Sequence, residues 1–171
     1  MKERALGSTA WCLRLTKGAF VIPSRTAIEK QFTFRFICPK LRAGPLDQLQ
    51  RATAALAAQA GVDTRKLLLD LCLGWDEVQL LAREPDVSIG AHSISHPILA
   101  KCDLTTAMRE IAENKIILEG RLGKPVRHLA YPFGDVSSVG AREFQLAGQA
   151  GYITAITSQP GHIFYKHAID L

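Results

Sequence analysis

The sequence predicts an α/β protein in which parallel strands alternate with helices. In the second half of the chain, an apolar stretch at 87–91 precedes a long amphipathic segment at 103–123. A second apolar stretch at 127–132 precedes another helical segment at 138–150, and a third apolar stretch follows at 152–158. Strand, helix, strand, helix, strand is the order expected of parallel strands joined by right-handed crossover connections.

Length and composition predict one folded domain. The chain has 171 residues, of which 47% are hydrophobic and 22% charged, so it can bury a sizeable core and is too apolar for a disordered chain. We expect a single domain over 1–171, with its regular core at 75–160 and no assigned structure for 1–44.

The net charge of +5 is concentrated at the beginning of the chain. Residues 1–51 hold 10 Lys/Arg against 3 Asp/Glu, and residues 52–171 hold 11 against 13. The basic residues are scattered singly among apolar ones, without a basic run or a nucleic-acid-binding motif. We therefore expect a solvated basic face and no nucleic acid as a partner.

Cysteine usage and the first residues bear on the compartment. The four cysteines are far apart, form no CxxC pair and are expected to be thiols. The apolar stretch near the start is interrupted by Arg14 and Lys17, which is poor for a signal peptide. No apolar run approaches the ~20 residues of a membrane span. The location is not specified beyond a cytoplasmic default.

The first helix that the sequence predicts covers residues 46–60. This segment is rich in helix formers and is followed by Gly61, a residue type that commonly ends helices. The preceding segment is ambiguous, because the phenylalanines of FTFRF (32–36) alternate as in a strand whereas residues 24–30 suit a helix. Both alternatives stay open for that segment.

A short helix is predicted at 75–84 and a long amphipathic one at 103–123. Asp103 can cap the long helix at its start, and Gly123 can end it. Trp75 is expected to lie in the core rather than to stack on a sugar. The face of the long helix that is predicted to pack on the core carries Leu104, Met108, Ile111, Leu118 and Leu122.

Two histidines, His92 and His96, follow the predicted strand at 87–91. If the chain stayed extended, their side chains would lie ~13 Å apart at about 3.3 Å per residue, too far for one metal ion. One helical turn brings residues four apart to about 6 Å, and Pro97 would end that turn. The spacing permits a two-histidine metal clamp, with an ordinary solvated loop as the alternative, since catalytic zinc usually has three protein ligands.

Two motifs lie at the ends of predicted strands, namely HSISHP (92–97) and LAYPFG (129–134). The first resembles the H-[ST]-x-x-H-[PS] element of the polysaccharide deacetylases, the carbohydrate esterase family 4 enzymes with a NodB homology domain. The second is similar to the next signature of that family and follows the next helix, as it does there. The similarity runs from about Trp75 to the end and more loosely through 45–74. It implies a partial (β/α) barrel of parallel strands alternating with helices.

The resemblance implies a metal-dependent hydrolase that removes acetyl groups from N-acetylated sugars such as chitin oligomers or peptidoglycan. One aspartate and two histidines hold the metal in that family, so His92 and His96 would be metal ligands here. A divalent metal, expected to be zinc, would polarise the amide carbonyl and lower the pKa of bound water toward ~7. The oxyanion and substrate loop, with the backbone N–H of its aromatic residue as donor, would comprise Tyr131, Pro132, Phe133 and Gly134.

The sequence departs from the family pattern at the carboxylates. The signature T-F-D-D-G, which supplies the catalytic base and the third metal ligand, is missing, and no Asp-Asp pair occurs in the chain. Asp76 and Glu77 are adjacent, but they belong to the helix predicted at 75–84. No catalytic base is therefore assigned, the metal is expected to be weakly bound, and the chain is expected to be a truncated, impaired enzyme.

Further departures lie near the second motif and the end of the chain. Many members have an arginine where this chain has Ala130, and Arg127 is the candidate substitute. The last family element, a leucine and a histidine, is absent unless His162 or His167 replaces it. A barrel without its first and last strands leaves edges and apolar faces uncovered, so self-association is expected.

A non-catalytic carbohydrate-binding or interaction module derived from a deacetylase is the alternative function. Such a module would bind chitin oligomers without turnover. Two other classes have little support, because the chain contains neither a G-x-S-x-G nucleophile elbow nor a G-x-x-x-x-G-K phosphate loop. Asp135, directly after the second motif, either orients a ligand histidine or serves as a helix-start residue near Ser137 and Ser138.

Overall fold

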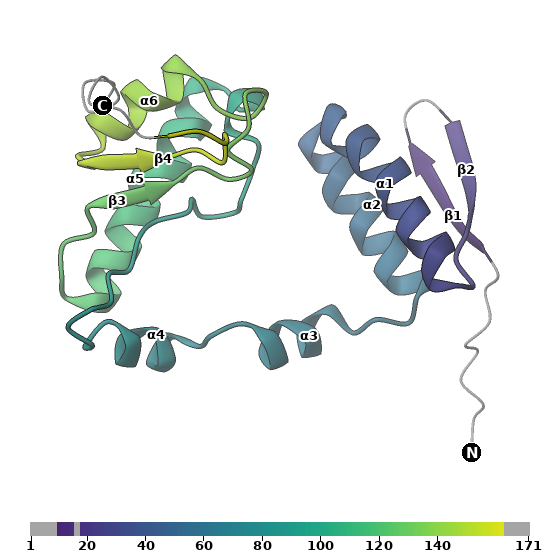
Figure 1. Cartoon of the computed structure of the whole chain (residues 1–171), viewed down its shortest axis with the longest axis horizontal. Coiled ribbons are helices and arrows are strands. Elements are labelled where there is room, and N and C mark those ends of the chain that lie inside the picture. Colours follow the sequence, from purple (N-terminus) through teal and green to yellow (C-terminus); the bar gives the residue numbers. More distant parts are fainter. Residues whose placement is uncertain (1–9, 16–17, 163–171) are drawn as a thin grey trace. The chain divides into compact units, whose positions relative to one another are not determined.

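The chain forms two compact units, residues 1–72 (the N-terminal unit) and residues 73–171 (the C-terminal unit). The computed structural model describes residues 10–15 and 18–162 (Figure 1). The N-terminal unit contains β1 (Ala10–Leu15), β2 (Gly18–Pro23), α1 (Ala27–Ala43), α2 (Leu46–Gln59) and α3 (Thr64–Leu71). The C-terminal unit contains α4 (Trp75–Leu81), the 3-10 helix η1 (Leu99–Lys101), α5 (Leu104–Leu122), β3 (His128–Ala130), α6 (Ala141–Gln149) and β4 (Thr154–Ile156).

In the N-terminal unit, β1 and β2 form an antiparallel hairpin that packs against α1 and α2. The side chain of Gln59 in α2 ties the hairpin down, since its oxygen accepts from the Cys12 N–H and its nitrogen donates to the Cys12 carbonyl, both at 2.8 Å. The helix α2 confirms the one predicted at 46–60. The core of this unit consists of Leu13, Ile22, Ile37, Leu41 and Ala52.

The helix α1 decides the segment for which the sequence left helix and strand open. A capping box starts it, because Thr26 Oγ1 accepts from the Glu29 N–H at 3.1 Å and the Glu29 carboxylate accepts from the Thr26 N–H at 2.9 Å. Phe32 and Phe34 are 67% and 66% exposed. The four-residue repeat of buried side chains thus prevails over the two-residue alternation of phenylalanines, and it comprises Thr33, Ile37 and Leu41.

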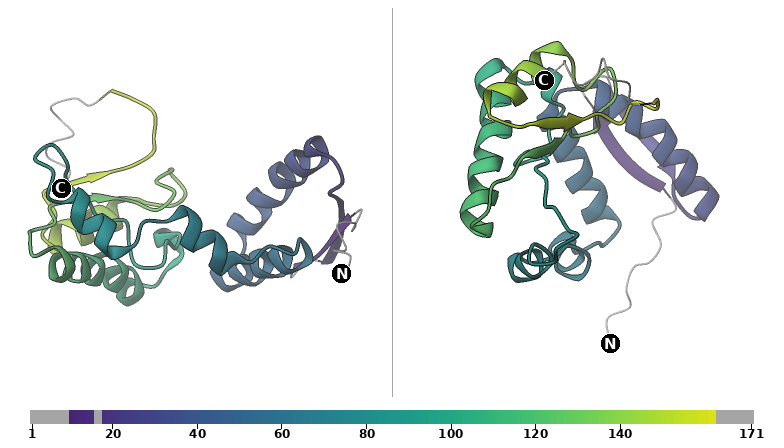
Figure 2. Two further views of the ribbon diagram at one scale, coloured as in Figure 1. Left: turned by 90° about the horizontal axis from the view of Figure 1, so that it is seen from below. Right: turned by 60° about the vertical axis from the view of Figure 1, so that its left-hand side comes forward.

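The C-terminal unit contains a small parallel sheet. β3 pairs with β4 in parallel, and the opposite edge of β3 bonds to Ala91, which accepts from the Ala130 N–H and donates to the His128 carbonyl. The helices α5 and α6 cover the sheet (Figures 1 and 2). The core between them includes Leu129 of the sheet together with Ala107, Ile111, Leu146 and Ala147 of the two helices.

The parallel sheet and its helices confirm the predicted α/β class. The strand predicted at 87–91 is reduced to the bridge at Ala91, because Val87 and Ser88 are exposed and the bonds to β3 come from Ala91 alone among these residues. The sheets formed by the described residues are two-stranded and open. A partial barrel is therefore not confirmed in the described part of the chain.

The helix α5 begins and ends where the sequence predicts. Asp103 accepts from the Thr106 N–H at 2.8 Å, and Gly123 ends the helix with a left-handed φ of 62°. Leu104, however, is 59% exposed, so its predicted place in the core is wrong. The same holds for Trp75, which is 40% exposed and lies 5.0 Å below the guanidinium of Arg121.

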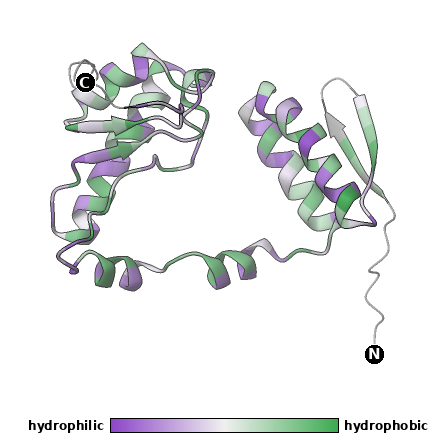
Figure 3. Ribbon diagram, in the orientation of Figure 1, coloured by the Kyte–Doolittle hydropathy of each residue, from purple (hydrophilic) through white to green (hydrophobic). Residues whose placement is uncertain are grey.

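Leucines of α3 face solvent. None of the side chains of this helix is buried, and Figure 3 shows apolar and polar residues mixed along it. The most exposed of these leucines is Leu69, whose exposed fraction is 77%. A run of exposed leucines is unusual on a folded surface and favours contact with another apolar surface. The run comprises Leu67, Leu68, Leu69 and Leu71.

The four cysteines are free thiols, as the sequence predicts. They are distributed over both units, at Cys12, Cys38, Cys72 and Cys102. Among the described residues, no helix combines the length and the hydropathy that crossing a bilayer requires.

Candidate functional site

Two loops of the C-terminal unit follow neighbouring segments that pair in parallel, the bridge residue Ala91 and β3. Residues 92–96 (the His loop) follow Ala91, and residues 131–134 (the aromatic loop) follow β3. Because Ala91 and β3 pair in parallel, both loops leave the sheet at the same end, where the strands finish. In open α/β sheets, ligands bind at this end of the sheet, at the carboxyl ends of the strands.

The His loop brings its two histidines together without a helical turn. The ring centroids of His92 and His96 are 4.8 Å apart, although Ser93 and His96 have left-handed φ angles of 62° and 55°. The expected proximity is present, but the helical turn predicted to produce it is wrong. Two left-handed residues reverse the chain within the loop instead, and the Ser93 Oγ accepts from the His96 N–H at 3.0 Å.

The ring of His92 is oriented by the backbone of β3. Its Nδ1 donates to the carbonyl oxygen of Ala130 at 2.8 Å. Since a carbonyl oxygen only accepts, Nδ1 carries the proton, and in the neutral ring Nε2 carries the free lone pair. Metal-binding histidines are commonly held in this way, with one nitrogen on the ion and the other on a backbone carbonyl.

The ring of His96 lies between the two loops. It contacts both the His92 ring and the Phe133 ring, each edge to face with ring centroids 4.8 Å apart. The two sequence motifs, which are 37 positions apart from His96 to Phe133, therefore meet through side chains. Both His92 and His96 are exposed to solvent, so a ligand can reach them.

Two polar residues of α5, Glu110 and Asn114, hold the His loop, and the sequence reasoning missed both. The Glu110 carboxylate accepts from the N–H groups of Ile94 and Ser95 at 2.9 and 2.8 Å and from the Ser95 Oγ at 2.7 Å. The Asn114 side-chain oxygen accepts from the His92 N–H at 3.0 Å. A signal was available, because Glu110 lies beside Ile111 on the apolar face of a helix, where an acidic residue needs partners.

The aromatic loop is a tight turn fastened to the segment after β4. Phe133 and Gly134 have left-handed φ angles of 62° and 70°. Ser158 donates its Oγ to the Phe133 carbonyl at 2.6 Å and its N–H to the Gly134 carbonyl at 3.0 Å. A Cβ at position 134 would lie 2.5 Å from the Ser158 nitrogen, so only glycine fits this approach. Ser158 is the second feature that the sequence reasoning missed.

Tyr131 and Pro132 of the aromatic loop are buried and support it from below. Tyr131 belongs to the core of the C-terminal unit, and its hydroxyl donates to the Glu143 carbonyl at 3.3 Å. Burial, and secondly the charge of Glu143, raise the pKa of the Tyr131 hydroxyl well above its ordinary value. Tyr131 therefore stays neutral and anchors the loop.

Other residues that the sequence singled out are exposed or accept hydrogen bonds from residues close to them in sequence. Asp135 accepts from the N–H and Oγ of Ser137 and from the Ser138 Oγ, within a turn. The helix start predicted there is wrong, because α6 begins at Ala141 with Gly140 as its N-cap. Glu77 accepts from the Gly74 N–H at the start of α4. Arg127, Asp76 and His162 are exposed, and His167 lies outside the described residues.

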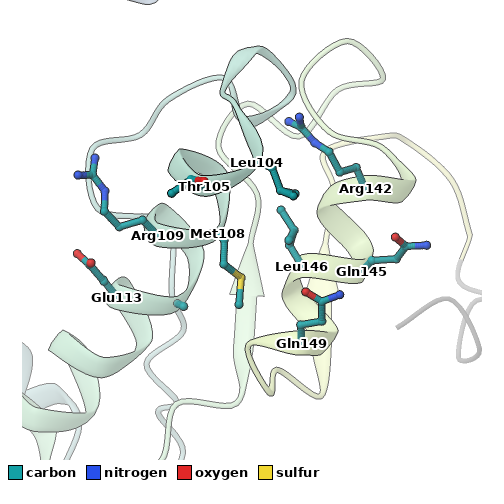
Figure 4. Close-up of a pocket in the computed structure, with 10 residues that line it drawn as sticks. Leu104, Thr105, Met108, Arg109, Glu113, Arg142, Gln145, Leu146 and Gln149 are labelled. Atoms are coloured by element: carbon teal, nitrogen blue, oxygen red, sulfur yellow. The ribbon is translucent and has the colours of Figure 1, made fainter.

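A pocket of about 670 Å³ lies between α5 and α6 (Figure 4). Leu104, Met108 and Leu146 form its apolar part, and Arg109 and Arg142 stand at its rim. The residues that line it do not include those of the His loop or the aromatic loop. The candidate site is thus an exposed surface between two loops and is separate from this pocket.

The donor set of the His loop fits part of a divalent-metal site. It supplies two imidazoles, one of them already oriented with Nε2 free, and zinc holds such nitrogens at about 2.1 Å. Within residues 10–15 and 18–162, no group of three His, Cys, Asp or Glu side chains is arranged to hold a metal ion. The described residues therefore offer two of the three protein ligands usual for catalytic zinc.

Comparison with known proteins identifies the family of the chain. The family profile described as polysaccharide deacetylase matches residues 42–155, about two thirds of the chain, and this range includes both loops. No curated protein and no solved structure matches the chain. The match confirms the resemblance that the motifs at 92–97 and 129–134 indicate. The chain belongs to the polysaccharide deacetylase family.

Proposed function

We propose that the C-terminal unit binds a divalent metal, zinc, through His92 and His96 and removes acetyl groups from N-acetylated amino-sugar polymers. The observation that supports this most directly is the meeting of the two motifs, with His92 on the Ala130 carbonyl and His96 against Phe133. Family membership supplies the reaction class, hydrolysis of an acetamide to an amine and acetate.

Each residue of the two loops has a role in this proposal. His92 would bind through Nε2 while Ala130 holds its Nδ1–H, and His96 would be the second ligand. The backbone N–H of Phe133 would stabilise the negative charge that develops on the acetyl oxygen. The bound metal would polarise the acetyl carbonyl and lower the pKa of water toward ~7.

The substrate class follows from the family and from the openness of the site. A polymer can reach His92 and His96 because both side chains lie on the surface. The contact of Ser158 with the aromatic loop would keep the Phe133 amide in place while different sugar chains bind. The partner in this proposal is thus an N-acetylated carbohydrate.

We expect the chain of 171 residues to bind its metal weakly and to turn over slowly. It contains no Asp-Asp pair, so the family's third ligand and its general base have no counterpart among the residues that we assign. General acid or base groups contribute about 10²–10⁴-fold to rate. A deficit of this order is expected relative to members that have both aspartates.

A metal titration combined with an acetate assay tests this function. The purified chain is titrated with Zn²⁺ or Co²⁺ and incubated with chitin oligomers, and the acetate released is measured. His92→Ala and His96→Ala should abolish metal binding and acetate release. The control His128→Gln, which replaces an imidazole bonded to the Thr154 hydroxyl, should retain both. Full metal affinity in His92→Ala would contradict the proposal.

The absence of an Asp-Asp pair also favours a second candidate, a carbohydrate-binding module without catalysis. In this case the two loops bind N-acetylated sugars, and the chemistry is lost. Equilibrium binding of chitin oligomers with no acetate release at any metal concentration would favour the module over the enzyme.

The proposal includes self-association through exposed apolar surface. β4 pairs with β3 on one edge only among the described residues, and Ile153 and Ile156 are 58% and 60% exposed. In a partial barrel, this edge would be the place where the parallel sheet stops. An open edge with apolar side chains readily pairs with a second chain.

A further inference from the structure

We infer that Glu110 and Asn114 are positioning residues that hold His92 and His96 in the geometry of a shared ligand site. The inference rests on the metal site proposed above for its function. The hydrogen bonds that carry it are independent of that proposal, since they are contacts of the chain with itself.

The His loop takes its shape from side-chain oxygens. Four of its five backbone N–H groups donate to such oxygens, namely those of His92, Ile94, Ser95 and His96. Three of the four bonds reach α5, where Asn114 receives one and Glu110 receives two. The shape of the His loop therefore depends on hydrogen bonds to side chains of α5.

The Glu110 carboxylate is built into the fold rather than left at its surface. The residue is 4% exposed, and its second oxygen accepts from the Ser95 Oγ at 2.7 Å. Asn114 follows one helical turn later on the same side of α5, so the two oxygens meet the loop at separate points.

These contacts bear directly on the histidines. The Asn114 oxygen fixes the backbone of His92, whose ring then reaches the Ala130 carbonyl. Glu110 fixes Ile94 and Ser95, which lie between two residues with left-handed backbone, Ser93 and His96. A loop released from Glu110 relaxes toward ordinary φ angles, and the His96 ring then leaves the place where it faces His92.

Two readouts test the inference on the whole chain. The first is residue-specific amide hydrogen exchange, which needs no metal. The second is the affinity for Zn²⁺. Glu110→Ala should speed exchange at Ile94 and Ser95 at least tenfold, leave Ile111 in α5 protected, and weaken Zn²⁺ binding by about 10–100-fold. Glu110→Gln keeps an acceptor oxygen and the volume, so it should restore most of the affinity.

The matched control is Glu113→Ala, which removes the next glutamate of the same helix from an exposed position. It should alter neither readout. Asn114→Ala provides a second test should Glu110→Ala fail to fold, with faster exchange at His92 and weaker Zn²⁺ binding, and Asn114→Asp should restore both because an oxygen acceptor remains.

The outcomes separate the inference from the proposed function. Wild-type chain that binds no Zn²⁺ would overturn the metal site, while exchange at His92, Ile94 and Ser95 would still decide the positioning role. That role is overturned if Asn114→Ala and the folded Glu110 variants match Glu113→Ala in both exchange and affinity. It is also overturned if Glu110→Gln loses as much affinity as Glu110→Ala, because the acceptor oxygen would then be irrelevant.

Discussion

Three non-glycine residues in the described chain have positive φ angles, and all of them lie in the two loops of the site. They are Ser93, His96 and Phe133. A left-handed backbone costs a residue with a side chain roughly 1–2 kcal/mol. Contacts from elsewhere must therefore hold these residues, and Glu110 and Ser158 supply them. At the scale of single residues, the two loops contain strained backbone that hydrogen bonds to residues distant in sequence hold in place.

Gly134→Ala should destabilise the C-terminal unit by about 2 kcal/mol or more. Alanine would have to adopt the φ of 70°, and its Cβ would lie 2.5 Å from the Ser158 nitrogen. The aromatic loop would then separate from Ser158. Urea unfolding measures the change as a lower midpoint at an unchanged slope.

The matched control for this change is Gly120→Ala in α5. A Cβ at Gly120 meets no atom within 4 Å, and its backbone is helical. Alanine in place of glycine within a helix stabilises by about 0.5–1 kcal/mol. If both alanine variants shifted the midpoint in the same direction, the close approach at Gly134 would not be the cause.

At the scale of elements, α5 carries three separate tasks along one helix. Its first turn is capped by Asp103, its apolar face enters the core with Ala107 and Ile111, and its polar pair Glu110 and Asn114 holds the His loop. Glu110 lies within two turns of the start of α5. Unwinding of the first turn would therefore disturb the residue that holds the His loop. The stability of this helix and the geometry of the site are coupled for that reason.

Loss of the Asp103 cap should loosen α5 in a pH-dependent way. The hydroxyl and the N–H of Thr106 both bond the Asp103 carboxylate and lower its pKa from 3.8. The contribution of the charged Asp103 carboxylate to the stability of α5 is thus present above pH 3.8 and is lost as the pH falls through the lowered pKa. At pH 7 the order of stability should be wild type, then Asp103→Asn, then Asp103→Ala.

Protection of the α5 amides in hydrogen exchange measures this order. The advantage of wild type over Asp103→Asn should disappear in acid, because the carboxyl is then neutral. The matched control is Asp63→Ala, which removes the cap of α3, a helix without buried residues. It should leave α5 unchanged. A wild-type advantage that persists in acid would show that the charge is not responsible.

At the scale of the whole molecule, two units share one family match. The matched range, 42–155, includes α2 and α3 of the N-terminal unit and nearly all described elements of the C-terminal unit. Each unit has its own core. Apolar side chains of α3 and β4 are exposed outside both cores, and we propose these two surfaces as the ones through which chains associate.

Ile156→Lys should reduce self-association of the chain. A lysine on an exposed strand edge adds a charge that a second strand cannot bury, which is how natural proteins protect such edges. Light scattering after gel filtration should show the wild type above 18.7 kDa, the mass of one chain, and the variant closer to it. Leu69→Lys adds the same charge to α3, at an apolar position that is 77% exposed against 60% for Ile156.

The two variants distinguish the association surfaces. If Leu69→Lys dissociates the chain and Ile156→Lys does not, association runs through α3 and the edge of β4 is not involved. A wild type that stays at 18.7 kDa over a wide concentration range would exclude self-association altogether.

The sequence was sufficient where the signal is local. Asp103 and Gly123 bound α5 as predicted, because capping depends on residues within one turn. It was insufficient in FTFRF, where two periodicities competed and packing of Ile37 and Leu41 against the hairpin decided for a helix. It was also insufficient at Leu104 and Trp75, because helical spacing marks a face without saying how far the core extends along it.

The sequence by itself determined the α/β order of elements in the C-terminal unit, the two motifs and the family to which they belong. Only the tertiary structure decided how the motifs meet, through Ala130 on His92 and Phe133 on His96. It also revealed Glu110 and Ser158, which hold the loops across 15 and 25 positions of sequence. The reason is physical: left-handed loops are unfavourable alone, so their shape depends on hydrogen bonds that only the folded chain brings within reach.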